Sequence, residues 1–138
     1  MKKIENIELT FLTQDDYQEL KKAMIESYTT MPNSYWKEHQ IDSLISRFPD
    51  GQVVIKVNNQ IAGCALSIIV DYSKISKHHT YQEITGDYTF NTHTDSGDML
   101  YGIDVFIKPE FRGLRLGRRL YDYRKDLCEK LNLKGVAF

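Results

Sequence analysis

The chain has 138 residues, of which 41% are hydrophobic and 27% are charged, a composition typical of one soluble domain with a buried core. Its formal net charge of -1 gives no overall attraction to nucleic acids or acidic membranes. No run approaches the roughly 20 apolar residues of a membrane span, and no apolar signal segment follows the N-terminus, so we expect a cytoplasmic protein. The two cysteines, Cys64 and Cys128, have neither a metal-ligand spacing nor the density of a disulfide scaffold, and we expect reduced thiols.

The N-terminal part predicts one strand and two helices. We expect the strand at Ile7–Leu12, and Thr13 is a favourable N-cap for the helix that follows. The inward face of this first helix is expected to consist of Tyr17, Leu20, Met24 and Tyr28. A second helix, capped by Ser34 and ended by Pro49, Asp50 and Gly51, is expected to bury Ile41, Leu44, Ile45 and Phe48.

A β-hairpin is predicted next. Its strands are Gln52–Val57 and Ile61–Val70, and the turn contains Asn58 and Asn59, which tolerate a positive φ. The second of these strands is apolar on both faces, which indicates a central position in a sheet.

The segment from Asp71 to Asp98 is polar and longer than ordinary connections between strands. A metal site could be assembled from His78, His79, His93, Asp95 and Asp98, but the spacing matches no recognised ligand pattern, and a solvated loop without a metal is the preferred interpretation. Loops on a rigid sheet commonly contact substrates, so the segment is also a candidate lid or part of a substrate pocket.

The stretch Leu100–Leu131 predicts a strand, a tight loop and an amphipathic helix. Val105, Phe106 and Ile107 favour a buried strand that ends before Pro109. The inner stripe of the helix is expected to consist of Leu116, Leu120, Tyr123, Leu127 and Leu131. Asn132 then permits a left-handed end to the helix.

The loop between strand and helix has the sequence RGLRLG, Arg112 to Gly117. The first turn of a helix leaves amide protons unpaired and carries about half a positive charge, so it suits an anion. Four arginines within eight residues add to this field: Arg112, Arg115, Arg118 and Arg119. The loop therefore predicts a phosphate site, although a solvated basic turn is the alternative.

This stretch resembles motif A of the GNAT superfamily of acetyl-CoA-dependent N-acetyltransferases. The signature of that family is Gln or Arg, two residues, Gly, one residue, then Gly or Ala; Arg112 and Gly117 match its ends, and Arg115 replaces the middle glycine. The run from Tyr101 to Lys134 is similar, more narrowly, to the acetyltransferase-like domain that precedes a carbon-nitrogen hydrolase domain in some bacterial proteins.

The resemblance implies an α/β (α+β) fold over residues 1–138, a mixed sheet flanked by helices in the order β-α-α-β-β-β-α-β. The chain stops in a strand that begins near Leu133, whereas the family continues through another helix and two more strands. We therefore expect a domain truncated at its C-terminus, either a fragment of a longer protein or a sheet completed by a partner. An open sheet edge favours pairing, so a homodimer is one expectation.

The implied chemistry is transfer of an acetyl group from acetyl-CoA, as cosubstrate, to a small-molecule or peptide amine. The resemblance places pantetheine along Val105, Phe106 and Ile107, with a strand amide near Val105 or Phe106 polarising the thioester carbonyl. It places the phosphates on the loop and first helical turn, namely Arg112, Gly113, Leu114, Arg115, Leu116, Gly117 and Arg118.

Asp104 lies on the same strand and is the first candidate for the general base that removes the amine proton. Glu83, His78 and His79 follow if the long loop folds over the site. The structural alternative for Asp104 is a pair with an arginine or a cap on a neighbouring turn. Tyr101, Tyr121 and Tyr123 are expected to be core or rim residues.

Two other classes of function remain. One is a non-catalytic domain that binds acyl-CoA or regulates an attached carbon-nitrogen hydrolase, favoured by Arg115 and by the missing C-terminal part. The other is nucleic-acid binding through the arginine cluster, which the slightly acidic net charge disfavours.

Overall fold

The computed structural model describes residues 4, 6–28, 35–74 and 80–137. Its five strands form one sheet in the order β1-β2-β3-β4-β5. The strands are β1 (Ile7–Phe11), β2 (Val53–Val57), β3 (Gln60–Val70), β4 (Met99–Ile107) and β5 (Gly135–Ala137). The first four pair antiparallel and β5 pairs parallel to β4, so the mixed sheet predicted from the sequence is confirmed.

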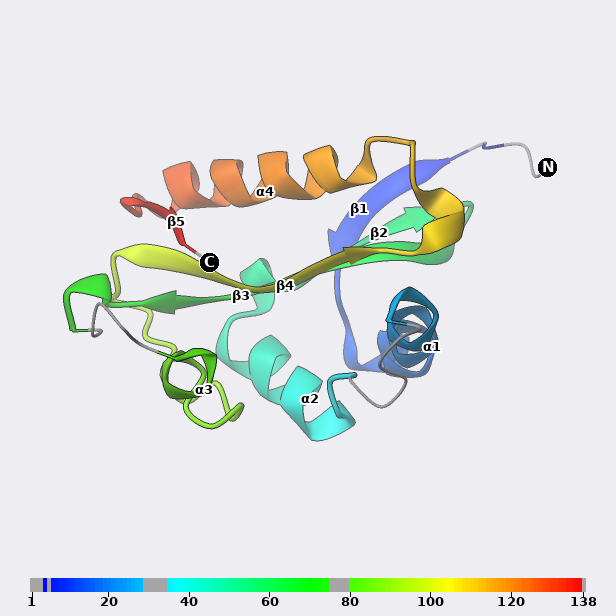
Figure 1. Cartoon of the computed structure of the whole chain (residues 1–138). Helices are drawn as coiled ribbons and strands as arrows, with labels where there is room; N and C mark the ends of the chain where they lie inside the picture. Colours follow the sequence, from blue (N-terminus) through cyan, green and yellow to red (C-terminus); the bar gives the residue numbers. More distant parts are fainter. Residues whose placement is uncertain (1–3, 5, 29–34, 75–79, 138) are drawn as a thin grey trace.

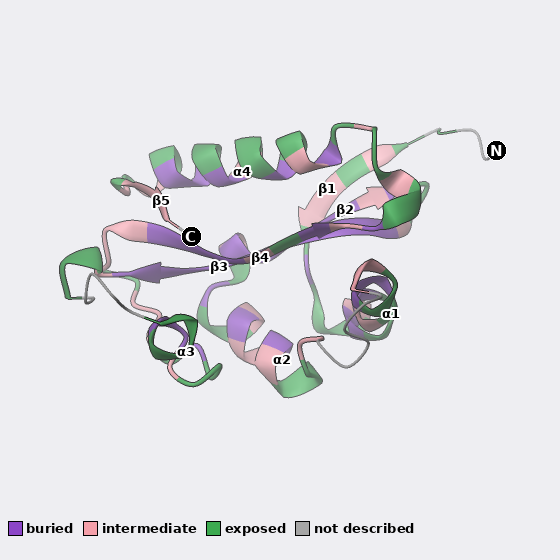
Figure 2. Cartoon of the chain, viewed as in Figure 1, coloured by how far each residue is buried: buried purple, intermediate pink, exposed green. Residues whose placement is uncertain are grey.

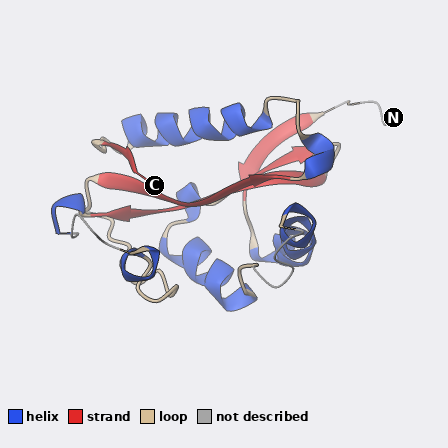
Figure 3. Cartoon of the chain, in the orientation of Figure 1, coloured by secondary structure: helices blue, strands red, loops and turns tan. Residues whose placement is uncertain are grey.

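Helices cover both faces of this sheet (Figures 1 and 3). Helices α1 (Tyr17–Ser27), α2 (Glu38–Arg47) and the short α3 (Tyr81–Ile84) lie on one face, and α4 (Leu116–Lys130) lies alone on the other. Each long helix turns its buried side to the sheet (Figure 2). The buried residues of α1 are Tyr17, Leu20, Ala23 and Met24, and those of α2 are Ile41 and Leu44.

The predicted hairpin is confirmed. Asn58 and Asn59 both have positive φ, 50° and 67°, in the turn between β2 and β3. Strand β3 is the middle strand of the five and is buried over nearly its whole length, as its unbroken apolar pattern predicted. Asn132, at φ 57°, confirms the left-handed end predicted after α4.

The predicted start of the second helix is wrong. Helix α2 begins at Glu38, with the extended residue Lys37 as its N-cap. The Gln40 side chain reaches back to accept the Lys37 backbone N–H at 2.8 Å, so the capping interaction comes from inside the helix. Ser34, the predicted cap, lies outside the described residues.

The described residues of the polar segment, 71–74 and 80–98, pack against the rest of the domain and do not form a solvated loop. It contains α3 and buries Ile84, Thr85 and Phe90, each at most 3% exposed. Its end is tied to the sheet, because the backbone amides of Thr94 and Asp98 donate to the carbonyl oxygens of Ile69 and Val70 on β3. The segment therefore forms part of the helical layer that also contains α1 and α2.

Candidate active site

The predicted phosphate loop connects β4 to α4. After Ile107 the chain makes a 3-10 turn at Pro109–Phe111 and enters α4 through Arg115, the N-cap residue. No side chain caps this helix, and its first turn contains no acidic residue. The amide protons and the positive end of the α4 dipole thus remain available to an anionic ligand.

The arginines of the loop also favour an anion site. Arg112, Arg115, Arg118 and Arg119 are all exposed. Within the described ranges, none of them takes part in an ion pair. Unneutralised positive charge therefore accumulates around the start of α4.

Two positions in the loop show why small residues are favoured there. Arg115, at the place of the middle glycine of the signature, has φ 60° and ψ 29°, the left-handed region in which glycine is least strained. Gly117 is different, because it lies in α4 and a Cβ built on it would meet nothing within 4 Å. Folding does not demand glycine at 117, so the missing side chain keeps the first turn of α4 open to a ligand.

Lys108 fixes the base of the loop. Its side chain is 6% exposed, and its ammonium lies 3.0 Å from Glu26 of α1 and 2.8 Å from Glu110 of the 3-10 turn. Burial alone would lower the pKa of Lys108, but the hydrogen bonds and charges of Glu110 and Glu26 outweigh it and raise that pKa. The ion pair between Lys108 and Glu26 joins the start of the predicted phosphate loop to α1, on the opposite face of the sheet from α4.

The outer edge of β4 is open beside the loop. Strand β5 pairs only with Met99–Tyr101, so in the described part of the chain no strand lies beyond β4 from Gly102 to Ile107. Val105 is therefore 43% exposed, and its predicted burial is wrong, whereas Phe106 is buried and Ile107 is half-buried. An extended ligand can reach the backbone of β4 from this edge.

A β-bulge in β4 determines where Asp104 points. Leu66 pairs with Asp104 but Ser67 pairs with Gly102, so Ile103 is an extra residue in β4. Side chains alternate along a strand, and the extra residue shifts that alternation by one. Asp104 consequently lies on the face covered by α1 and α2, together with Phe106.

Two hydrogen-bond donors meet at the Asp104 carboxylate. The Tyr28 hydroxyl donates to both carboxylate oxygens at 2.9 Å, and the Trp36 indole N–H donates to Oδ2 at 3.1 Å. Burial, followed by the Asp104 charge, raises the pKa of Tyr28, so this phenol remains a donor. Tyr28, expected in the inward stripe of the first helix, lies just after α1; it packs against the core as expected and also bonds to Asp104.

Arg124 holds the bulge from the other face. It is 3% exposed and donates from Nη2 to the carbonyl oxygens of Leu66 at 2.7 Å and of Asp104 at 3.0 Å. Burial lowers the pKa of Arg124. The sequence left open that the Asp104 carboxylate pairs with an arginine. Arg124 does contact Asp104, but through the backbone carbonyl oxygen of that residue. The apolar stripe of α4 predicted Leu116, Leu120 and Leu127 correctly, but gave no sign of a buried arginine.

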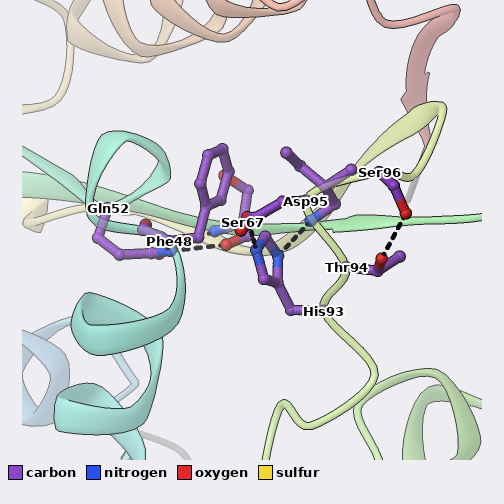
Figure 4. Close-up of polar contacts among 8 residues, drawn as sticks. Phe48, Gln52, Ser67, His93, Thr94, Asp95 and Ser96 are labelled. Carbon is purple, nitrogen blue, oxygen red and sulfur yellow. Dashed lines mark hydrogen bonds and ion pairs between the residues drawn. The ribbon is translucent and has the colours of Figure 1, made fainter.

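The remaining candidates lie in segment 71–98. Glu83 is exposed on α3, and His78 and His79 lie outside the described residues. His93 and Asp95 do come together, with Nε2 and Oδ1 2.8 Å apart. His93 Nδ1 accepts the Ile69 backbone N–H at 2.9 Å, and the ring stacks on Phe48 (Figure 4). Both ring nitrogens are thereby engaged, and this pair anchors the loop to β3.

The network around His93 continues through Gln52 (Figure 4). The Gln52 amide donates to the carbonyl oxygens of Phe48 and Ser67 and accepts the Ser67 N–H. Asp98 accepts the Tyr72 backbone N–H and pairs with Lys134. Over the described residues, no group of three or more His, Cys, Asp or Glu is arranged to hold a metal ion.

A family model described as "Acetyltransferase (GNAT) family" matches residues 17–138, which include β2–β5 and all four helices. The chain belongs to the GNAT family of acetyltransferases. In the part of the chain described here, no helix is long and apolar enough to cross a membrane.

Two curated relatives come from Bacillus subtilis. "Probable hydrolase YhcX" is 36% identical over 101 residues, which are 73% of this chain and 20% of that protein. "Uncharacterized N-acetyltransferase YkwB" is 29% identical over 101 residues, 73% of this chain and 45% of that protein. The chain thus spans less than half the length of either relative.

Solved structures share the fold. The loading GNATL domain of CurA from Lyngbya majuscula has a TM-score of 0.74 and 22% identity, covering 90% of this chain and 59% of that one. A GNAT acetyltransferase from Brucella melitensis, solved with acetyl-CoA, has a TM-score of 0.55 and 12% identity, covering 95% of this chain and 73% of that one. At these identities the likeness concerns the fold alone.

Proposed function

We propose that this GNAT domain binds acetyl-CoA and transfers its acetyl group directly to an amine, which is a small molecule or a peptide. The observation that carries the proposal is the uncapped, arginine-surrounded start of α4, where Gly117 leaves open space that folding does not require. Backbone amides and arginines converging on one point are the usual protein partners of phosphate groups.

The residues proposed to hold the cosubstrate are those of the loop and the adjacent strand. Arg112, Arg118 and the amides from Gly113 to Gly117 face the phosphates, with Arg115 at the N-cap. The open edge of β4 at Val105–Ile107 takes the pantetheine, and an amide at Val105 or Phe106 polarises the carbonyl. When bound, acetyl-CoA supplies the acetyl thioester, whose C–S bond breaks as the amine nitrogen forms a C–N bond.

Asp104 is proposed as the general base. It lies next to Val105 on β4, and the bulge directs its carboxylate to the face away from α4. The Tyr28 hydroxyl, shared between both oxygens, and the Trp36 N–H donate to it and fix its orientation. Its role is to accept a proton from the incoming ammonium ion, since only the neutral amine attacks; water accepts the second proton lost from nitrogen and returns one to the leaving thiolate.

The proposal is tested by calorimetric titration of the purified chain with acetyl-CoA and with free CoA. Arg112→Ala and Arg118→Ala are each expected to weaken binding about tenfold, because each removes a charged partner of a phosphate. Lys125→Ala, an exposed cation further along α4, is the matched control and should leave affinity unchanged. A folded wild-type chain that gives no heat with either ligand would contradict the proposal.

A second function is favoured by one specific observation. The relative named a hydrolase is matched over only 20% of its length, so in that protein the matched segment accompanies a larger remainder. The alternative is therefore a domain that binds acyl-CoA without transfer and regulates an attached carbon-nitrogen hydrolase. Release of free thiol from acetyl-CoA, followed across a panel of amines, separates the two, because this alternative predicts binding without turnover.

A further inference from the structure

A group of aromatic rings lies on the side of the sheet away from α4, and one of them, Trp36, contacts the Asp104 carboxylate. The Trp36 ring lies 6.4 Å from Tyr81, 6.2 Å from Tyr88 and 5.4 Å from Phe90, measured between centroids, and Tyr81 lies 6.0 Å from Tyr88. We call Trp36, Tyr81, Tyr88 and Phe90 the aromatic box. Its rings come from the approach to α2, from α3 and from the turn after α3.

The aromatic box is only partly buried. Phe90 is fully buried, but Tyr81 and Tyr88 are each 38% exposed and Trp36 is half-buried. The Tyr81 hydroxyl is fixed by donation to the Ile103 carbonyl oxygen at the bulge. Three of the four rings are therefore partly exposed, where a closed hydrophobic core would have covered them.

The backbone is strained where it presents two of these rings. Gly86, Asp87, Tyr88 and Phe90 all have positive φ, between 56° and 65°. Bulky residues rarely adopt this conformation, and strain of this kind persists where surrounding contacts hold it. Here the contacts are the ring packing of Tyr88 and Phe90 on Trp36.

The charge inside this arrangement is negative. Among the described residues, no cationic side chain forms an ion pair with the Asp104 carboxylate; its donors, Tyr28 and Trp36, are neutral. The sequence from His78 to Ile107 contains five acidic residues and no lysine or arginine, although Lys77 directly precedes it. On the α2 side, His39 and Arg47 line a pocket with Tyr88. The nearby ammonium groups of Lys21 and Lys37 stack on Tyr35. A half-buried carboxylate without a cationic partner favours binding of a cation.

We infer that the aromatic box and Asp104 form the acceptor subsite, and that its substrate is an aliphatic amine bound as an ammonium ion with no carboxylate near the nitrogen. Cations bind over the faces of tryptophan and tyrosine, and Asp104 supplies the counter-charge. A carboxylate next to the substrate nitrogen would be repelled by Asp104, with which no cationic side chain of the described residues forms an ion pair. This inference rests on the proposed function and specifies its acceptor.

The chain provides its own probe, because Trp36 is its one tryptophan. Fluorescence of the full chain is titrated with propylammonium chloride at millimolar concentrations, with potassium chloride added to keep ionic strength constant. Propanol has the same carbon chain as propylammonium but no charge. β-Alanine keeps the ammonium group and carries a carboxylate in place of the terminal methyl group. A saturable change with propylammonium alone is expected. No saturable change, or an equal one with propanol or β-alanine, would overturn the inference.

Variants localise the response. Tyr88→Leu is expected to raise the dissociation constant of propylammonium about threefold to tenfold, the size of one cation–π contact. Tyr88→Phe keeps the ring and should bind as the wild type does. Tyr121→Leu removes an exposed tyrosine of α4 on the opposite face and is the control. Equal affinity in Tyr88→Leu and Tyr88→Phe, in folded proteins, would contradict the box.

Acetyl-CoA calorimetry on the same preparation separates this inference from the proposed function. Heat with acetyl-CoA but no fluorescence response to propylammonium refutes the acceptor subsite and leaves the proposed function standing. A propylammonium response without acetyl-CoA binding supports the box and refutes the proposed function.

Discussion

The two ends of the candidate active site are built in different ways. The phosphate loop is one continuous stretch, Arg112 to Gly117, between a strand and a helix. The acceptor face around Asp104 is assembled from Tyr28, Trp36 and Tyr81, of which Tyr28 is 76 positions away from Asp104 in the sequence. A continuous loop carries its chemistry in adjacent residues, whereas the acceptor face exists only after the helices have packed on the sheet.

The two ends also differ in charge. Four arginines surround the loop without acidic partners in the described ranges, and a carboxylate without a cationic partner lies at the acceptor face. An anionic cosubstrate would therefore bind where β4 leads into α4, and a cationic acceptor would approach Asp104 on the opposite face of the sheet. Four substitutions break or sharpen this comparison.

Asp104→Asn has the largest expected effect. Asparagine keeps an oxygen for the Tyr28 hydroxyl but cannot accept the proton of an ammonium ion, so kcat should fall about 100-fold. The KM for acetyl-CoA should stay unchanged, because the loop is untouched. Thiol release with propylamine measures both constants. A kcat within threefold of the wild type would remove Asp104 from the role of base.

Arg124→Met tests whether Arg124 holds the bulge of β4 that positions Asp104. Two buried carbonyl oxygens, of Leu66 and Asp104, lose charge-assisted donors, and the free energy of unfolding should fall by about 3 kcal/mol. Urea denaturation measures the loss. Arg119→Met, exposed on the same helix, is the control and should change stability by less than about 0.5 kcal/mol. Similar losses in both variants would show that Arg124 does not hold the bulge.

Lys108→Met tests the base of the phosphate loop. At pH 7 it should cost about 2 kcal/mol of stability, because two hydrogen bonds to carboxylates are lost. The pKa of Lys108 is raised in the folded chain from an ordinary value of 10.5, so its contribution is complete below that pH and is lost as pH rises further. The difference between wild type and variant, from urea denaturation at each pH, should narrow only above about pH 10.5. A difference that narrows already near pH 7 would contradict this account.

Arg115→Gly has the smallest effect and the opposite sign. Arg115 is left-handed at φ 60°, and glycine there should stabilise the chain by about 0.5–1 kcal/mol. Arg118→Gly, inside the same helix, should instead lose about 1 kcal/mol. Chemical denaturation of the pair reports both signs, and a loss in Arg115→Gly would mean that the arginine side chain makes a stabilising contact of its own.

Features formed by adjacent residues could be predicted from the sequence, whereas features assembled by tertiary packing could not. The hairpin, the central strand and α4 follow from local periodicity and turn residues, as Asn58 and Asn59 illustrate. The phosphate loop could be proposed because its residues are adjacent. The exposure of Val105 could not be foreseen, since it depends on where β5 stops beside β4.

Other features have no local signal at all. The extra residue Ile103 sits in an apolar strand, and its bulge appears only in the pairing with β3. Arg124 resembles the other charged residues of α4 in sequence, yet it is buried because it faces the carbonyls of that bulge. The sequence around Trp36 gives no sign of a site residue, because its contact with Asp104 depends on tertiary packing.

Steady-state kinetics with both substrates varied tests the central claim most directly, that the arginine loop and the aromatic box serve the two halves of one transfer. Thiol release is measured for Arg112→Ala and Tyr88→Leu against the wild type. We predict that Arg112→Ala raises the KM for acetyl-CoA about tenfold and leaves that for propylamine unchanged, and that Tyr88→Leu does the reverse. If both variants raise the same KM, or if neither KM changes, the division of the site between the arginine loop and the aromatic box is contradicted.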